Sequence, residues 1–138
     1  MKLRLSILAA ATLMATPALA AEPIQGRWIT EEKDAVVLIA KCGKTVCGKI
    51  TKFLVPPPDG LDQRDINNDD PALRERKLLG LPVLSGFEDD GKRWRGRIYD
   101  PKSGNTYRSL LRRKDANTLE VKGCIGPFCQ TQLWKRAK

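Results

Sequence analysis

The segment from Trp94 to Tyr107 predicts a β-hairpin, and it sets the pattern for the rest of the chain. Along its first half Trp94 and Ile98 alternate with Arg95 and Arg97, which is the period-two pattern of a strand. The sequence D-P-K-S-G-N then reverses the chain, because proline suits the second position of a turn and Gly-Asn tolerates positive φ. We therefore expect two antiparallel strands joined by a tight turn.

Short strands of the same kind follow one another through most of the chain. We expect strands at 26–30, 35–41, 48–55, 82–88, 93–99, 106–113, 119–123 and 129–136. Most of them are joined by tight turns, so neighbours in sequence pair as antiparallel neighbours in the sheet. Such a sheet removes its exposed edges by closing on itself. The prediction is an all-β fold, an eight-stranded antiparallel up-and-down β-barrel.

The long connection between the third and fourth strands is expected to hold one short helix. Pro56–Pro58 cannot continue a sheet, because prolines lack the amide proton that pairing requires. Asp70 then stands where a helix N-cap is expected, followed by proline at the first helical position. We predict a helix over Pro71–Leu78, with Leu73 and Leu78 facing the barrel.

Residues 1–20 have the organisation of a secretory signal peptide. Lys2 and Arg4 precede the apolar run Leu5–Thr16, and Ala18-Leu19-Ala20 forms a cleavage site that ends near Ala20. A membrane anchor is the alternative, but it requires roughly 20 apolar residues. We expect residues 21–138 to form a single domain. It keeps 23 of the 25 basic residues against 16 acidic ones, a net charge of +7.

Four cysteines occur in two copies of one spacing, Cys42 with Cys47 and Cys124 with Cys129. An even count in an exported protein favours disulfides, and four intervening residues that include glycine suit a hairpin. We expect the two local pairs to be bonded, among three possible pairings. A four-thiolate zinc site is the alternative, although its ligands usually lie closer in sequence and the chain has no histidine.

Several motifs, in order, resemble the bacterial exported proteins of domain-of-unknown-function family 2147. They are G-x-W at 26–28, C-G-x-x-x-C-G-K-I at 42–50, D-x-N-N-D-x-P-x-L-R-x-R at 65–76, Y-D-P-x-S-G-x-x-Y at 99–107 and L-W-K-R at 133–136. The resemblance spans about residues 24–136. It implies that the domain at 21–138 is a lipocalin-like barrel of the family-2147 type, located in the periplasm or secreted. It implies no chemical activity.

G-x-W in the first strand and the arginine in the last one also resemble lipocalins, in which the tryptophan closes the barrel floor beneath the arginine. Trp28 and Arg136 are the matching positions, and we expect them to have a structural role.

The residue types present do not favour catalysis. Without histidine, the Ser-His and Cys-His nucleophile pairs are excluded, so we expect no enzyme. We also expect no cofactor and no metal site. Asp65, Asn67 and Asp69 imitate the start of a calcium loop, but its sixth and twelfth positions are Asp70 and Arg76 in place of glycine and glutamate. A carboxylate pair of the glycosidase kind is a further alternative within this loop.

We hypothesise that the barrel binds a small apolar or amphipathic ligand, with expected lining residues Trp94, Ile98, Tyr107 and Leu119. The alternative is a basic module that docks on anionic envelope material or on a protein partner. Its expected anion-binding residues are Arg93, Arg95, Arg97, Arg108 and Arg112. A nucleic acid partner is not expected, because the chain lacks a recognition helix and an aromatic stacking array. Nor does any second apolar segment reach membrane-spanning length.

Overall fold

The computed structural model of this protein describes residues 10–17 and 19–138. The predicted signal peptide therefore lies partly outside the described residues, and its described part forms neither helix nor strand. Among the helices of the described residues, none is both long enough and apolar enough to cross a membrane.

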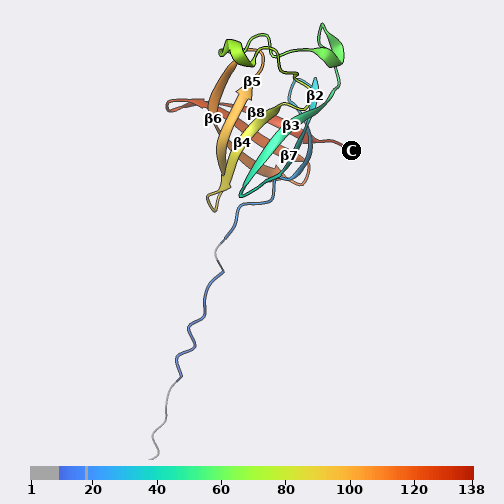
Figure 1. The fold of residues 1–138 in the computed structure, drawn as a ribbon. Coiled ribbons are helices and arrows are strands. Elements are labelled where there is room, and N and C mark those ends of the chain that lie inside the picture. Colours follow the sequence, from blue (N-terminus) through green and yellow to red (C-terminus); the bar gives the residue numbers. More distant parts are fainter. Residues whose placement is uncertain (1–9, 18) are drawn as a thin grey trace, which may run out of the picture.

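Eight antiparallel strands form a closed barrel in which each strand pairs with its neighbours in sequence and β1 pairs with β8 (Figure 1). The up-and-down barrel predicted from the alternating pattern is confirmed. The strands are β1 Gly26–Ile29, β2 Ala35–Cys42, β3 Thr45–Phe53, β4 Pro82–Asp89, β5 Trp94–Asp100, β6 Asn105–Asp115, β7 Thr118–Ile125 and β8 Phe128–Arg136.

The two ends of the barrel differ in how the chain covers them. The long β3–β4 connection, green in Figure 1, lies across one end, where the β1–β2 and β5–β6 turns are also found. The chain enters the barrel from the other end, which the hairpin turns of β2–β3, β4–β5 and β6–β7 surround. We call the first the open end and the second the floor.

Trp28 and Arg136 close the floor. The Trp28 side chain is fully buried, and its indole Nε1 donates to the Ile24 carbonyl at 2.9 Å. The Arg136 guanidinium carbon lies 4.3 Å from the centroid of the Trp28 ring, and Nε of Arg136 donates to the Ala116 carbonyl. Gly26 has a φ of +138°, and a Cβ added there would lie only 2.5 Å from Nη1 of Arg136. These contacts place both residues in the packing of the floor.

The helix predicted over Pro71–Leu78 is much shorter in the structure. The cap is as expected, since the Asp70 carboxylate accepts from the Ala72 amide, but only a 3₁₀ turn at Pro71–Leu73 follows. A second 3₁₀ turn lies at Gly60–Asp62. The chain after residue 73 instead pairs with residues 63–65, through Asp65 N to Arg76 O and Leu78 N to Gln63 O. This pairing consumes the backbone groups that a longer helix needs, so Leu78 packs on the core while Leu73 does not.

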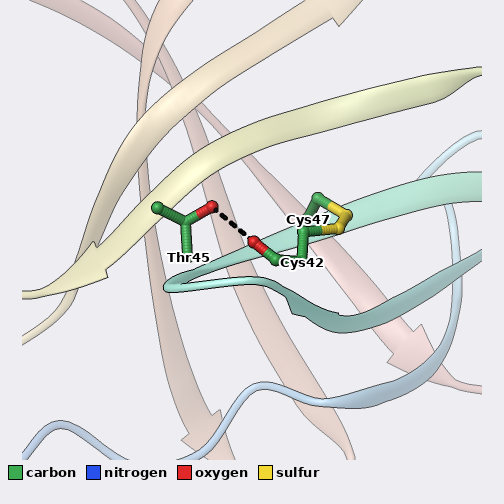
Figure 2. Close-up of a disulfide and its surroundings, with 3 residues drawn as sticks. All are labelled: Cys42, Thr45 and Cys47. Atoms are coloured by element: carbon green, nitrogen blue, oxygen red, sulfur yellow. Dashed lines mark hydrogen bonds between the residues drawn. A yellow bond between two sulfur atoms is a disulfide. The ribbon is translucent and has the colours of Figure 1, made fainter.

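Both disulfides join cysteines that are local in sequence, Cys42 to Cys47 and Cys124 to Cys129, which is the pairing expected from the spacing. They sit differently in their hairpins. Cys124 and Cys129 are direct cross-strand partners, whereas Cys42 lies opposite Thr45, whose hydroxyl donates to the Cys42 carbonyl at 3.3 Å (Figure 2). The first disulfide marks the floor end of β2–β3, and the second lies at the opposite end of its strands.

Candidate functional site

A cavity of about 640 Å³ occupies the open end of the barrel. Its inner wall is apolar and comes from strands on several sides, with Val37, Ile50, Val83, Ile98 and Trp134 among the residues that line it. The size falls within the range of roughly 300 to 1,000 Å³ that small-molecule sites usually have. The barrel is therefore hollow at this end, although its floor is filled by side chains.

The rim of the cavity is polar and carries charges of both signs. Lys102, from the β5–β6 turn, pairs with Glu32 and, at 3.3 Å, with Asp34 of the β1–β2 turn. Burial opposes ionisation of Asp34, but the hydrogen bond from Thr30 and the neighbouring Lys102 together lower its pKa. The hydrogen bond with Glu32 raises the pKa of Lys102. These charges tie two turns together at the mouth, so the apolar wall ends in a polar ring.

Asp65 is the centre of a buried hydrogen-bond network that holds the long β3–β4 connection on the barrel. Its carboxylate accepts from the Tyr99 hydroxyl, from Nδ2 of Asn68 at 2.9 Å and from Nε of Arg76 at 2.9 Å. Nδ2 of Asn68 also donates to the Tyr99 hydroxyl at 3.1 Å. The calcium-loop alternative is not supported, since the Asp65 oxygens already bind three protein donors. The network fixes the segment that supplies Gln63, Arg64, Ile66 and Asn67 to the cavity wall.

Gly104 allows the connection to approach the β5–β6 turn closely. Its φ is +76°, and an added Cβ would overlap the carbonyl oxygen of Asn67. The Gly104 carbonyl accepts from the Asp69 amide at 3.1 Å, and Nδ2 of Asn67 donates to the Pro101 carbonyl at 3.3 Å. The motifs at 65–76 and 99–107, far apart in sequence, thus meet at the open end of the barrel.

The raised pKa of Tyr99 predicts that the free energy of unfolding depends on pH. Its side chain is 9% exposed, and burial together with the hydrogen bond to Asp65 raises the pKa of Tyr99 to about 12, from 10.0. The folded state thus retains the phenol proton when the unfolded chain has lost it. This contribution is complete below pH 10.0 and is lost as the pH rises to about 12.

We expect the free energy of unfolding to fall more steeply between these pH values in the wild type than in Tyr99→Phe, measured by denaturant titration. The chain has two tyrosines, so the difference between the ultraviolet titrations of the two proteins isolates Tyr99. Equal slopes, or a Tyr99 transition at the value of a free tyrosine, would contradict the expectation.

Of the four residues expected to line a ligand site, only Ile98 lies in the cavity wall. Trp94 lies toward the floor, where its Nε1 donates to the Glu22 carbonyl, and Leu119 is fully buried in the core opposite Trp134. Tyr107 is half-buried beside Ser103. Strand alternation identified an inward face but not the level along the barrel at which the cavity lies, so Trp94 and Leu119 were expected at a level nearer the floor than the cavity. Tyr107 lies at the level of its cross-strand partner Ile98, but it is not among the residues of the cavity wall.

Most of the arginines expected to bind an anion have partners within the protein. Arg93 and Arg95 lie 3.6 and 2.6 Å from the Asp90 carboxylate, and Arg112 lies 2.7 Å from Glu120. Hydrogen bonds from Arg95 and from nearby backbone amides hold the pKa of Asp90 well below its usual range. Arg108 donates to the Gly126 carbonyl, and Arg97 makes no ion pair within 4 Å among the described residues. The five positions therefore do not form one free cationic surface.

Sequence reasoning did not identify most of the residues at the cavity. Glu32, Asp34 and Lys102 belong to turns that were assigned only as chain reversals, and Gln130 and Gln132 were assigned no role within their strand. The feature that these residues share is their position: all of them lie at the end of the barrel where the β1–β2, β5–β6 and β7–β8 turns are found. That position becomes useful as a signal only when the strand order is known.

Comparisons with known proteins agree with this architecture. Residues 26–136 match the model of a family described as "Uncharacterized protein conserved in bacteria (DUF2147)". A solved structure described as "Protein HP1028 from the human pathogen Helicobacter pylori belongs to the lipocalin family" superposes with a TM-score of 0.72 at 23% sequence identity, covering 84% of each chain. At this identity the likeness concerns the fold. No curated protein sequence matches the chain.

Proposed function

The chain belongs to the bacterial family described as uncharacterized protein conserved in bacteria and has a lipocalin-like barrel, and from this premise we propose that it binds a small apolar or amphipathic molecule without catalysing a reaction. The observation that carries the proposal is the cavity of about 640 Å³ at the open end. Its volume suits a small molecule, and its wall and rim indicate which kind.

The distribution of polar groups supports an amphipathic ligand. Val37, Ile50 and Ile98 provide an apolar wall in the interior, where an unpaired polar group of a ligand would lose its hydrogen bonds to water. Lys102, Asp34 and Arg64 lie nearer the rim, where a polar head group is able to keep contact with both charges and solvent. A molecule with an apolar body and one polar end fits this order.

A binding role without catalysis is supported by the chemistry of the residues. The chain contains no histidine, and its four cysteines are in disulfides. The best-defined titratable cluster, Asp65 with Tyr99 and Arg76, is saturated by its internal hydrogen bonds and holds the connection in place. It is organised as a support for the cavity wall.

An extracytoplasmic location of the mature protein is part of the proposal. The first twenty residues have the organisation of a bacterial signal peptide, and disulfides persist in oxidising compartments. The periplasm or the exterior of the cell satisfies both observations. The alternative of a basic module that docks on anionic envelope material is less well supported, since Arg93 and Arg95 pair with Asp90 and Arg112 pairs with Glu120.

Native mass spectrometry of the protein purified from its own periplasm tests the proposal. We expect the native spectrum to show a small molecule that co-purifies with the protein. Organic solvent should release this molecule, and its mass should identify it as an amphiphile. In parallel, the protein with its ligand removed is titrated with an environment-sensitive fluorescent amphiphile. Neither a bound molecule nor saturable binding of the probe would contradict the proposal.

A charge placed in the apolar wall is expected to abolish binding. Ile98→Glu places a carboxylate in the cavity wall. An apolar ligand that fills the cavity would strip water from this carboxylate without replacing its hydrogen bonds. We therefore expect the affinity for the probe to fall by about tenfold or more. The matched control is Thr106→Glu, which adds the same charge to an exposed site on the neighbouring strand β6. The control should bind like the wild type. Equal affinities for the two variants would place the ligand elsewhere.

A further inference from the structure

Strand β8 has an edge that no other strand covers. It pairs with β7 over its whole length, from Phe128 opposite Ile125 to Lys135 opposite Thr118. On its other side it pairs with β1 only at Lys135 and Arg136, because β1 is four residues long. Within the described residues, the part of β8 before Leu133 therefore has one paired side and one open side.

The direction of the backbone groups along this edge follows from hydrogen bonds at its covered end. The amide of Ala137 donates to the Arg27 carbonyl of β1, and the amide of Leu133 donates on the same side to the Glu31 carboxylate at 3.1 Å. The amide of Arg136 donates in the opposite direction, to Asn117. Since amides alternate along a strand, the N–H and C=O groups of Cys129 and Thr131 face the open side.

This edge lacks the features that usually protect an edge strand. Phe128–Gln132 contains no charged residue and no proline, and all five residues are exposed. Phe128 and Ile125, at the tip, are 80% and 70% exposed. The Cys124–Cys129 disulfide holds the hairpin together, and the hairpin projects from the barrel wall, orange to red in Figure 1. The edge is thus extended and pre-organised for pairing.

We propose that two copies of this chain associate by antiparallel pairing of β8 with β8 about a two-fold axis. In the register that uses the free groups, Cys129 of each copy exchanges both backbone hydrogen bonds with Thr131 of the other. The two Gln130 residues then face each other at the axis, and Phe128 lies opposite Gln132 of the second copy. The association uses the backbone groups of β8, while the side chains of Gln130 and Gln132 in the same segment also line the cavity.

A second copy fits this edge better than an unrelated strand for two reasons. A strand that presents donors and acceptors in alternation is complementary to itself under two-fold symmetry, so one surface serves both partners. In addition, the mature chain carries a net charge of +7, and contact through an uncharged segment keeps the positive charges of the two molecules apart.

Removal of a single outward amide tests the pairing. We expect analytical ultracentrifugation of the oxidised mature protein to show a monomer–dimer equilibrium, and Thr131→Pro to weaken it by about tenfold or more. Proline at this position deletes the N–H of the open edge and leaves the hydrogen bonds to β7 in place. Thr131→Val, which keeps the amide, is the matched control and should dimerise like the wild type. Thermal unfolding verifies that all three proteins are folded.

Cross-linking tests the register. In Gln130→Cys the new thiols face each other across the axis, at the separation of direct cross-strand partners, and should form a covalent dimer under mild oxidation. In Gln132→Cys the thiol faces Phe128 of the other copy, so cross-linking should be weak. A wild type that stays monomeric up to its solubility limit would overturn the proposal. A Thr131→Pro dimer as tight as the wild type, or equal cross-linking at the two positions, would overturn it as well.

Discussion

Asp65→Ala is expected to lower the free energy of unfolding by about 3 kcal/mol. The substitution removes the acceptor for Tyr99, Asn68 and Arg76 together. The Tyr99 hydroxyl and the Asn68 amide are buried, so each loses a partner that water does not easily replace. The loss is partly offset at Arg76, whose side chain is 37% exposed and is able to turn toward solvent. Urea denaturation of the purified variant measures the change.

The matched control for this variant is Asp62→Ala, in the same connection. Asp62 is 80% exposed and pairs with Lys77 at 3.0 Å, an ion pair of the surface kind that contributes little to stability because water and salt screen it. Because Asp65 also fixes the segment that lines the cavity, its variant should bind the fluorescent amphiphile more weakly while the control binds normally. A loss below about 1 kcal/mol in Asp65→Ala would show that the network does not hold the connection.

Trp28→Ala is expected to cost about 3 to 5 kcal/mol of unfolding free energy, the range for deleting a large buried aromatic side chain. Trp28 is fully buried at the floor, among Ile24 and the strands β1 and β2. Its loss also leaves the Ile24 carbonyl without its donor and Arg136 without the ring beneath it. The midpoint of denaturant unfolding, monitored by circular dichroism, gives the size of the change.

Two further variants separate the contributions at the floor. Trp28→Phe keeps an aromatic ring but removes the indole donor, so its cost should be clearly smaller than that of alanine. Trp94→Ala removes a tryptophan that is only half-buried and should also cost less. If Trp94→Ala proved as damaging as Trp28→Ala, burial at the floor would not explain the role of Trp28.

Strand alternation and turn chemistry were sufficient to predict the barrel. The turn at 100–105 lies between β5 and β6 as expected, and the predicted strands agree with the observed ones to within about three residues at most ends. The helix predicted over 71–78 is longer than the observed 3₁₀ turn. Its cap depends on neighbouring residues, whereas its continuation depends on which partners the later backbone groups find. Arg76 and Leu78 are used in pairing with residues 63–65, and no local signal announces that pairing.

The candidate site was predictable only in part, for a related reason. The inward direction of Ile98 follows from its parity in β5. Tyr99 has the outward parity of Arg95 and Arg97, and it is nevertheless buried, because the β3–β4 connection folds back over it and binds it through Asp65. The spacing of the arginines predicted a common basic surface. In the folded protein, however, Asp90 and Glu120 form ion pairs with some of them.

Residue order is sufficient to predict the strand pattern, the local pairing of the cysteines and the family, since each depends on residues that are close in the chain or on their order along it. The folded structure was needed to show that the barrel is hollow at one end and filled at the other. It also brought Asp65 to Tyr99 and left one edge of β8 open. These features arise where segments distant in sequence meet, and the volume left between them depends on how all eight strands close.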